Sequence, residues 1–118
     1  MSFKVQIENE LNKKHWNIIL IDSLNEWWED EHWKIQWKHS KGLEIYIQFL
    51  VDPMRSEFIY EVRAIKDLQG ARIMQENESE ISIISMTKRK FNLKLETFIS
   101  EIETYRKNHE NKNTQQTL

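Results

Sequence analysis

Glu29-Asp30-Glu31-His32 is the run of side chains best suited to chemistry, because carboxylates and imidazoles bind zinc or manganese and also transfer protons. Four consecutive side chains converge on one ion only where the backbone is sharply folded, and the HExxH spacing of a helical zinc site is absent from the sequence. We therefore expect this run to be a solvated turn, and the sequence predicts no metal site.

Other residue types give no support for catalysis. The chain has no cysteine, which excludes thiolate chemistry, disulfides and cysteine-bound zinc. It has two glycines, and it lacks a glycine-rich phosphate loop. His15, His32, His39 and His109 share no diagnostic spacing, and no serine stands in a G-x-S-x-G context. We predict no catalytic residue and no cofactor, and expect that the protein is not an enzyme.

A basic run, Lys88-Arg89-Lys90, precedes or opens a predicted helix. Cations are unfavourably placed at a helix N-terminus, where the dipole prefers negative charge. A bound anion, held by free N–H groups and the basic side chains, would relieve this conflict. The other interpretation is that these long side chains simply extend into water. This run, or a pocket beside His39, is the basis of our alternative hypothesis, a small-molecule or anion-binding protein with or without catalytic activity.

Two adjacent tryptophans suggest contact with a protein. Trp27 and Trp28 point to opposite sides if their segment is extended, so one indole is expected to be partly exposed. Exposed tryptophan is enriched at protein interfaces. We therefore predict that this pair takes part in partner binding.

Three apolar side chains, Leu50, Ile59 and Ile65, fall on a sheet face that is otherwise polar. They form a second predicted partner-binding patch, for another protein or for a second copy of the chain. The alternative is that the strand beginning at residue 16, or the loop after residue 67, covers them.

Alternation of apolar and polar residues predicts an antiparallel meander of three strands, at residues 33–39, 43–51 and 58–66. A three-residue loop with Gly42 in the left-handed conformation would close the first hairpin. That loop places Trp33 opposite Phe49 and Trp37 opposite Ile45, with all four side chains on the core face.

The remaining elements complete an α+β fold. Residues 3–14 are predicted to be helical, and residues 16–21 to form a buried strand, since they are short, apolar and β-branched. A further strand is expected at 81–86, and apolar residues spaced four and three apart from Phe91 to Tyr105 predict a helix. We expect an antiparallel sheet of about five strands, with the N-terminal and C-terminal helices packed on one face.

Size and charge restrict the function further. The chain of 118 residues is expected to form one domain over 1–107, followed by a flexible polar tail over 108–118. The net charge is -2, and the basic residues of the outer sheet face alternate with glutamates, so we expect no nucleic-acid binding.

The longest apolar run, Ile18 to Ile21, is far shorter than the roughly 20 residues that a membrane span needs. The N-terminus lacks the order of a signal peptide, so a cytoplasmic protein without membrane association is expected. The sequence thus predicts a small soluble, non-catalytic binding module that acts through protein–protein contacts or self-association, with an unknown partner.

Overall fold

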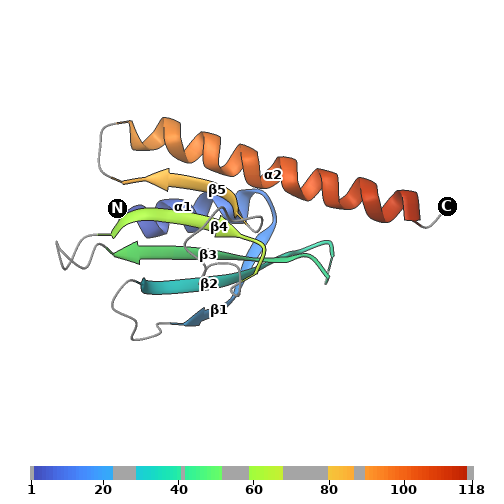
Figure 1. Cartoon of the computed structure of the whole chain (residues 1–118), viewed down its shortest axis with the longest axis horizontal. Helices are drawn as coiled ribbons and strands as arrows, with labels where there is room; N and C mark the ends of the chain where they lie inside the picture. The colour runs from blue at the N-terminus through green and yellow to red at the C-terminus, as the bar shows by residue number, and fades with distance from the viewer. Residues whose placement is uncertain are drawn as a thin grey trace.

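The computed structural model describes residues 2–22, 29–40, 42–51, 59–67, 80–86 and 90–116. Within these ranges, five antiparallel strands form one sheet in the order in which they follow along the chain. Two helices, one from each end of the chain, pack against this sheet (Figure 1), which confirms the predicted α+β architecture. The elements are α1 (Phe3–Lys13), β1 (Trp16–Asp22), β2 (Glu29–Trp37), β3 (Glu44–Val51), β4 (Ile59–Ile65), β5 (Glu80–Ser85) and α2 (Phe91–Gln116).

Local sequence explains where α1 begins and ends. The hydroxyl of Ser2 accepts a hydrogen bond from the backbone N–H of Val5 at 3.3 Å, which satisfies one of the free donors of the first turn. Ile7 and Leu11 lie four residues apart, share one face and are buried. After the helix, His15 adopts a positive φ of 71°, and the chain reverses into β1.

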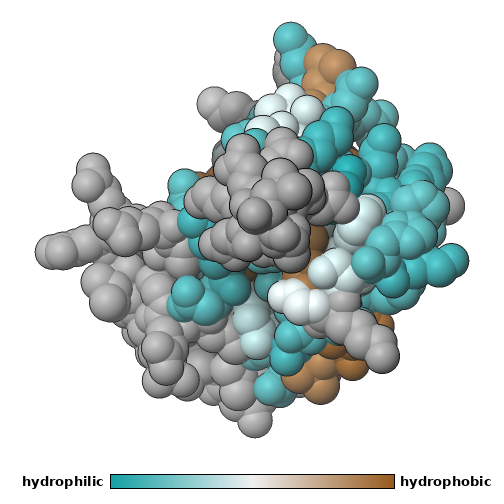
Figure 2. All heavy atoms as spheres, turned by 90° about the vertical axis from the view of Figure 1, so that its right-hand side faces the viewer, coloured by the Kyte–Doolittle hydropathy of each residue, from teal (hydrophilic) through white to brown (hydrophobic). Residues whose placement is uncertain are grey.

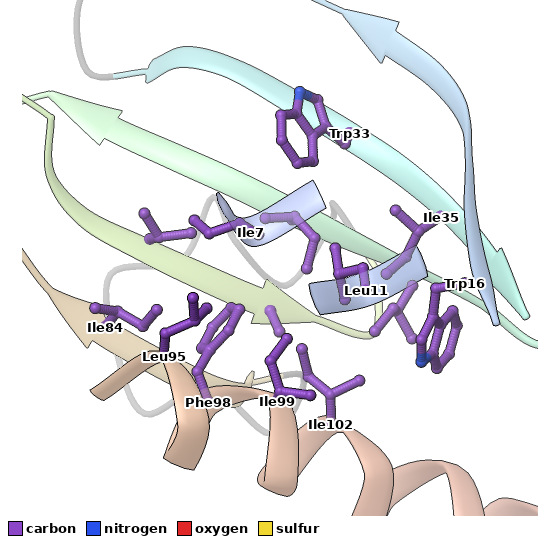
Figure 3. Packing of buried hydrophobic residues seen from close by; sticks show 14 of the residues in the cluster. Ile7, Leu11, Trp16, Trp33, Ile35, Ile84, Leu95, Phe98, Ile99 and Ile102 are labelled. Atoms are coloured by element: carbon purple, nitrogen blue, oxygen red, sulfur yellow. The ribbon is translucent and has the colours of Figure 1, made fainter. Parts of the chain in front are cut away.

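The hydrophobic core lies between the helices and one face of the sheet (Figure 3). Trp33 is buried there, as predicted. Trp37 faces the same side but is only half-buried: its Nε1 donates to the carbonyl of Lys14 at 3.1 Å, and the guanidinium of Arg106 lies 4.4 Å from its ring centre. The labelled core residues are Ile7, Leu11, Trp16, Trp33, Ile35, Ile84, Leu95, Phe98, Ile99 and Ile102.

The register of the first hairpin differs from the predicted register by two residues. Trp33 lies opposite Ile47, whereas the predicted partner is Phe49. The prediction was wrong because it assumed a tight loop with Gly42 in the left-handed conformation, and Gly42 does not adopt it. A shift by two leaves every side chain on its predicted face, because side chains alternate with a period of two.

The same shift occurs between β3 and β4. Phe49 lies opposite Val62, whereas the predicted partner is Tyr60. The turn predicted at residues 52–55 lies outside the described residues. Val62 and Ala64 keep their predicted core face, and the predicted cross-strand pairs are wrong. The irregularity between Leu50 and Val51 also changes the start of β4: Ile59, which is predicted on the outer face, packs against the core cluster.

The C-terminal helix is longer than predicted. α2 runs from Phe91 to Gln116 and thus includes most of the segment 108–118 that the sequence predicts to be a tail. Over residues 91–109, the part of α2 whose burial is described, the last buried residue is Ile102, and the helix continues beyond the end of the sheet (Figure 1). The flexibility of that segment stays a prediction. Neither α1 nor α2, over the described residues, combines the length and hydrophobicity needed to cross a membrane.

Candidate functional site

The predicted patch of Leu50, Ile59 and Ile65 is largely buried in the structure. Leu50 is 4% exposed and Ile65 is 0% exposed, and Ile59 is half-buried against the core cluster. The alternative expectation, that these side chains are covered, agrees with this burial. A role in partner binding stays a prediction for them, but in the isolated chain Leu50 and Ile65 present almost no exposed apolar surface, and Ile59 presents only part of its side chain.

Four other predicted site residues, Trp27, Trp28, Lys88 and Arg89, lie outside the described residues. Lys90, the last residue of the basic run, is exposed and adopts a positive φ of 72° just before α2. Its carbonyl accepts a hydrogen bond from the backbone N–H of Lys94 at 3.1 Å, which begins the helix. Anion binding by this run stays a prediction.

Half of the exposed large hydrophobic side chains among the described residues lie on β1, and the others are Val5 on α1, Ile83 on β5 and Leu93 on α2. Ile19 is 46% exposed, Leu20 is 49% exposed and Ile21 is 57% exposed. We name these three consecutive residues the β1 patch. The expectation of a buried strand at residues 16–21 was therefore wrong for four of its six residues, since Asn17 is exposed as well. Figure 2 shows hydrophobic side chains gathered at the lower edge of the molecule, the side on which β1 lies in Figure 1.

The exposure of the β1 patch follows from its place in the sheet. β1 lies at the end of the strand order and pairs with β2 alone among the described strands. Trp16 and Ile18, at its beginning, face the core, and Trp16 is fully buried. A bulge between Ile18 and Leu20 then shifts the register with β2. Beyond this bulge, Leu20 and Ile21 are exposed and no longer pack against the core.

Charge is distributed unequally along β1. Lys14 and His15, which precede the strand, are both exposed. Asp22, its last residue, has a side chain that is 46% exposed and lies 4.0 Å from Nε2 of His32. Between these ends, the strand carries no charged side chain. The edge of the sheet is thus basic at one end, apolar in the middle and acidic at the other end.

A second feature is a buried polar cluster at the start of β2. Oε1 of Glu29 accepts a hydrogen bond from Nδ1 of His32 at 2.9 Å, and Oε2 accepts one from Nε2 of Gln48 at 2.5 Å. All three side chains are buried, and the ring of Tyr46 meets the imidazole edge-on at 6.0 Å. The amide oxygen of Gln48 has no hydrogen-bond partner among the described residues.

This cluster corrects the expectation that Glu29-Asp30-Glu31-His32 is a solvated turn. The run belongs to β2, and a bulge between Glu29 and Glu31 brings Glu29 and His32 together on one face. The described residues contain no group of three side chains that would hold a metal ion. In a buried carboxylate–imidazole pair of this kind, each group supplies a hydrogen-bond partner to the other.

The surroundings of His39 are aromatic. Its exposed ring packs edge-on against Trp37 at 4.8 Å and against His15 at 5.1 Å. A groove of about 570 Å³ lies elsewhere, between the two helices. Its lining combines four amide side chains with one acidic, one basic and one apolar side chain: Gln6, Asn9, Asn12 and Asn92, with Glu10, Lys13 and Leu95. Such a lining offers hydrogen bonds to a polar ligand, but nothing else in the described residues points to one.

Comparisons of the chain with protein-family models, with curated proteins and with solved structures found no match. The assignment of a function therefore depends on the geometry of the chain itself. The feature that the sequence did not reveal, the β1 patch, had one signal: Ile18, Ile19, Leu20 and Ile21 are consecutive and apolar. In a strand, such a run must point to both faces, and a sheet covered mainly on one face leaves part of it exposed.

Proposed function

We propose that this protein is a non-catalytic binding module, and that a protein partner binds at β1 by adding an extended segment to the edge of the sheet. In strand addition, backbone hydrogen bonds supply affinity and alternate side chains supply specificity. The β1 patch is the observation that carries the proposal, because three consecutive apolar side chains at a sheet edge favour pairing with another chain.

The edge lacks the usual protection against such pairing. Edge strands commonly carry lysine or proline, which oppose association with another strand. Trp16 to Ile21 contains neither, and its only protective feature is the bulge beside Ile19. Trp27 and Trp28 follow within the segment that connects β1 to β2 in the sequence, so we propose them as further contributors to the same interface.

A pair of matched substitutions tests this proposal. Ile21 and Leu93 are 57% and 58% exposed, and Leu93 lies on α2, away from β1 in the fold. We expect Ile21→Lys to abolish capture of the partner from cells of origin, because a charge would be desolvated at the interface. Leu93→Lys should leave capture intact. The measurement is quantitative mass spectrometry of the captured proteins, with the folded state of each variant checked by circular dichroism.

Equal capture by the wild type and both lysine variants would contradict the proposal. In that case binding, if present, does not use the β1 patch. A thermal-shift series with phosphates, nucleotides and divalent metals then examines the alternative of an anion or small-molecule site, since a ligand that binds only the native state raises the melting temperature.

A further inference from the structure

We infer that the partner at β1 is a second copy of this chain, joined edge to edge in antiparallel orientation about a two-fold axis. This inference rests on the proposed binding function of β1 and names the occupant of that surface. Pairing of the two edges would join two five-stranded sheets into one continuous sheet. Three observations on β1 favour a copy over a foreign segment.

The first observation is that the centre of β1 is complementary to itself. Asn17 to Ile21 carries no charge, so an antiparallel copy brings no like charges opposite one another along this stretch. In the register that sets Asp22 beside Lys14 of the copy, the two-fold axis passes near Ile18, so Ile19 and Leu20 lie beside Asn17 and Trp16 of the other strand. Pairing would then remove part of the exposed apolar surface of both strands from water.

The second observation is the opposite charge of the two ends. Antiparallel pairing reverses one strand relative to the other, so the acidic end at Asp22 lies alongside the basic end at Lys14 and His15 of the copy. The two-fold axis creates this contact twice. A parallel arrangement would bring like ends together and would be opposed at both of them.

The third observation is that little repulsion opposes contact between two copies, and that the other sheet edge is less suited to pairing. The net charge of -2 is small, so repulsion between two copies is weak. The other edge strand, β5, is less suited to pairing, because it carries Glu80 and α2 hydrogen-bonds to it through Glu101 and Lys94. Of the two described edges, β1 is thus the one available for self-association.

The expected dimer is weak. One pair of short strands makes a smaller interface than those of stable complexes, and the bulge beside Ile19 interrupts its regular pairing. We therefore expect a monomer–dimer equilibrium that depends on protein concentration. Sedimentation velocity of the full chain across a wide range of concentration measures it directly.

Charge reversal tests the orientation. Lys14→Asp and Asp22→Lys each create two like-charge contacts across the axis, and each is expected to weaken the dimer by about tenfold. A mixture of the two variants forms a heterodimer in which both contacts are again attractive, so mixing should restore association. The double variant should also recover dimerisation. A purely structural role of either residue would give no recovery on mixing.

The lysine variants serve as the second test. Ile21→Lys is expected to abolish the dimer, and Leu93→Lys, at equal exposure, is expected to leave it unchanged. A wild type that is monomeric throughout, a dimer that persists in Ile21→Lys, or charge-reversal variants that fail to associate on mixing would each overturn the inference. A monomeric wild type whose capture of a partner is lost in Ile21→Lys would refute the self-association and leave the proposed function standing.

Discussion

Glu29 illustrates, at the scale of a single residue, how neighbouring side chains satisfy a buried carboxylate. Both of its carboxylate oxygens accept hydrogen bonds, one from His32 and one from Gln48. Each donor is itself buried and would be costly to leave without a partner. Glu29 therefore holds β2 to β3 on the outer face of the sheet, opposite the hydrophobic core.

Removal of this carboxylate should destabilise the folded chain. We expect Glu29→Ala to lower the free energy of unfolding by about 2–4 kcal/mol, because it leaves two buried donors unsatisfied. Glu29→Gln should cost less, since the amide of Gln48 can turn over and donate or accept as required. Urea denaturation measures both values. The control is Glu96→Ala, at an exposed position on α2, which should change stability little.

If Glu29→Ala and Glu96→Ala had the same small effect, the buried hydrogen bonds of Glu29 would contribute nothing net to stability. The cluster would then be only a consequence of the bulge in β2.

At the scale of elements, α2 divides into two parts. Its first half carries the core residues Leu95, Phe98, Ile99 and Ile102. Tyr105 and Arg106, one turn further on, are half-buried, and Arg106 stacks on Trp37. From Lys107 the sequence is polar, and the helix continues past the sheet (Figure 1).

Truncation separates these two parts. A chain that ends after Lys107 should keep its free energy of unfolding to within about 0.5 kcal/mol, because no residue known to be buried is removed. A chain that ends after Glu101 loses Ile102, and should be destabilised by at least about 2 kcal/mol. Chemical denaturation of the two truncated chains checks this. A large loss in the longer one would show that residues 108–118 belong to the domain.

The molecule as a whole is expected to lose stability at alkaline pH. Burial, the largest single influence, lowers the pKa of Lys4, but hydrogen bonds and charges from Asp30 and Glu31 outweigh it and raise the pKa above 10.5. These contacts, both at 2.7 Å, link α1 to β2. Burial raises the pKa of Tyr105 above its ordinary value of 10.0.

Both shifts have the same sign. A group whose pKa is higher in the folded chain contributes stability below its unfolded pKa, and that contribution is lost as the pH rises through the folded pKa. We therefore expect the free energy of unfolding to fall as the pH rises above about 10. Tyr105→Phe removes one of the two titrations and should make the decline shallower. Denaturation at a series of pH values measures this, and parallel curves for the two proteins would contradict it.

The alternation of apolar and polar residues in the strands shows why the cross-strand register was harder to predict than the face on which each side chain lies. Alternation around Trp33 distinguishes inside from outside, and it stays the same when a strand slides by two residues. The choice between Ile47 and Phe49 as the partner of Trp33 depends on the conformation of the hairpin loop and on packing along the whole strand. Neither is encoded in the alternation itself.

The burial of Leu50 and Ile65 and the exposure of the β1 patch could not be assigned from the sequence for a related reason. All of these side chains are apolar, and whether an apolar side chain is buried depends on which other segments of the chain pack over it. Likewise, the meeting of Glu29 and His32 requires a bulge, which has no signal in the run of four residues.

The sequence by itself determined the order of the elements and the faces of the sheet apart from Ile59, because helix and strand periods and the cap at Ser2 act over a few neighbouring residues. Only the tertiary structure decided which strand lies at the edge and which apolar residues remain in water. An edge is a property of the strand order, and strand order arises from contacts between segments far apart in the chain. The residues Ile19, Leu20 and Ile21 are equally compatible with a buried central strand and with an exposed edge strand.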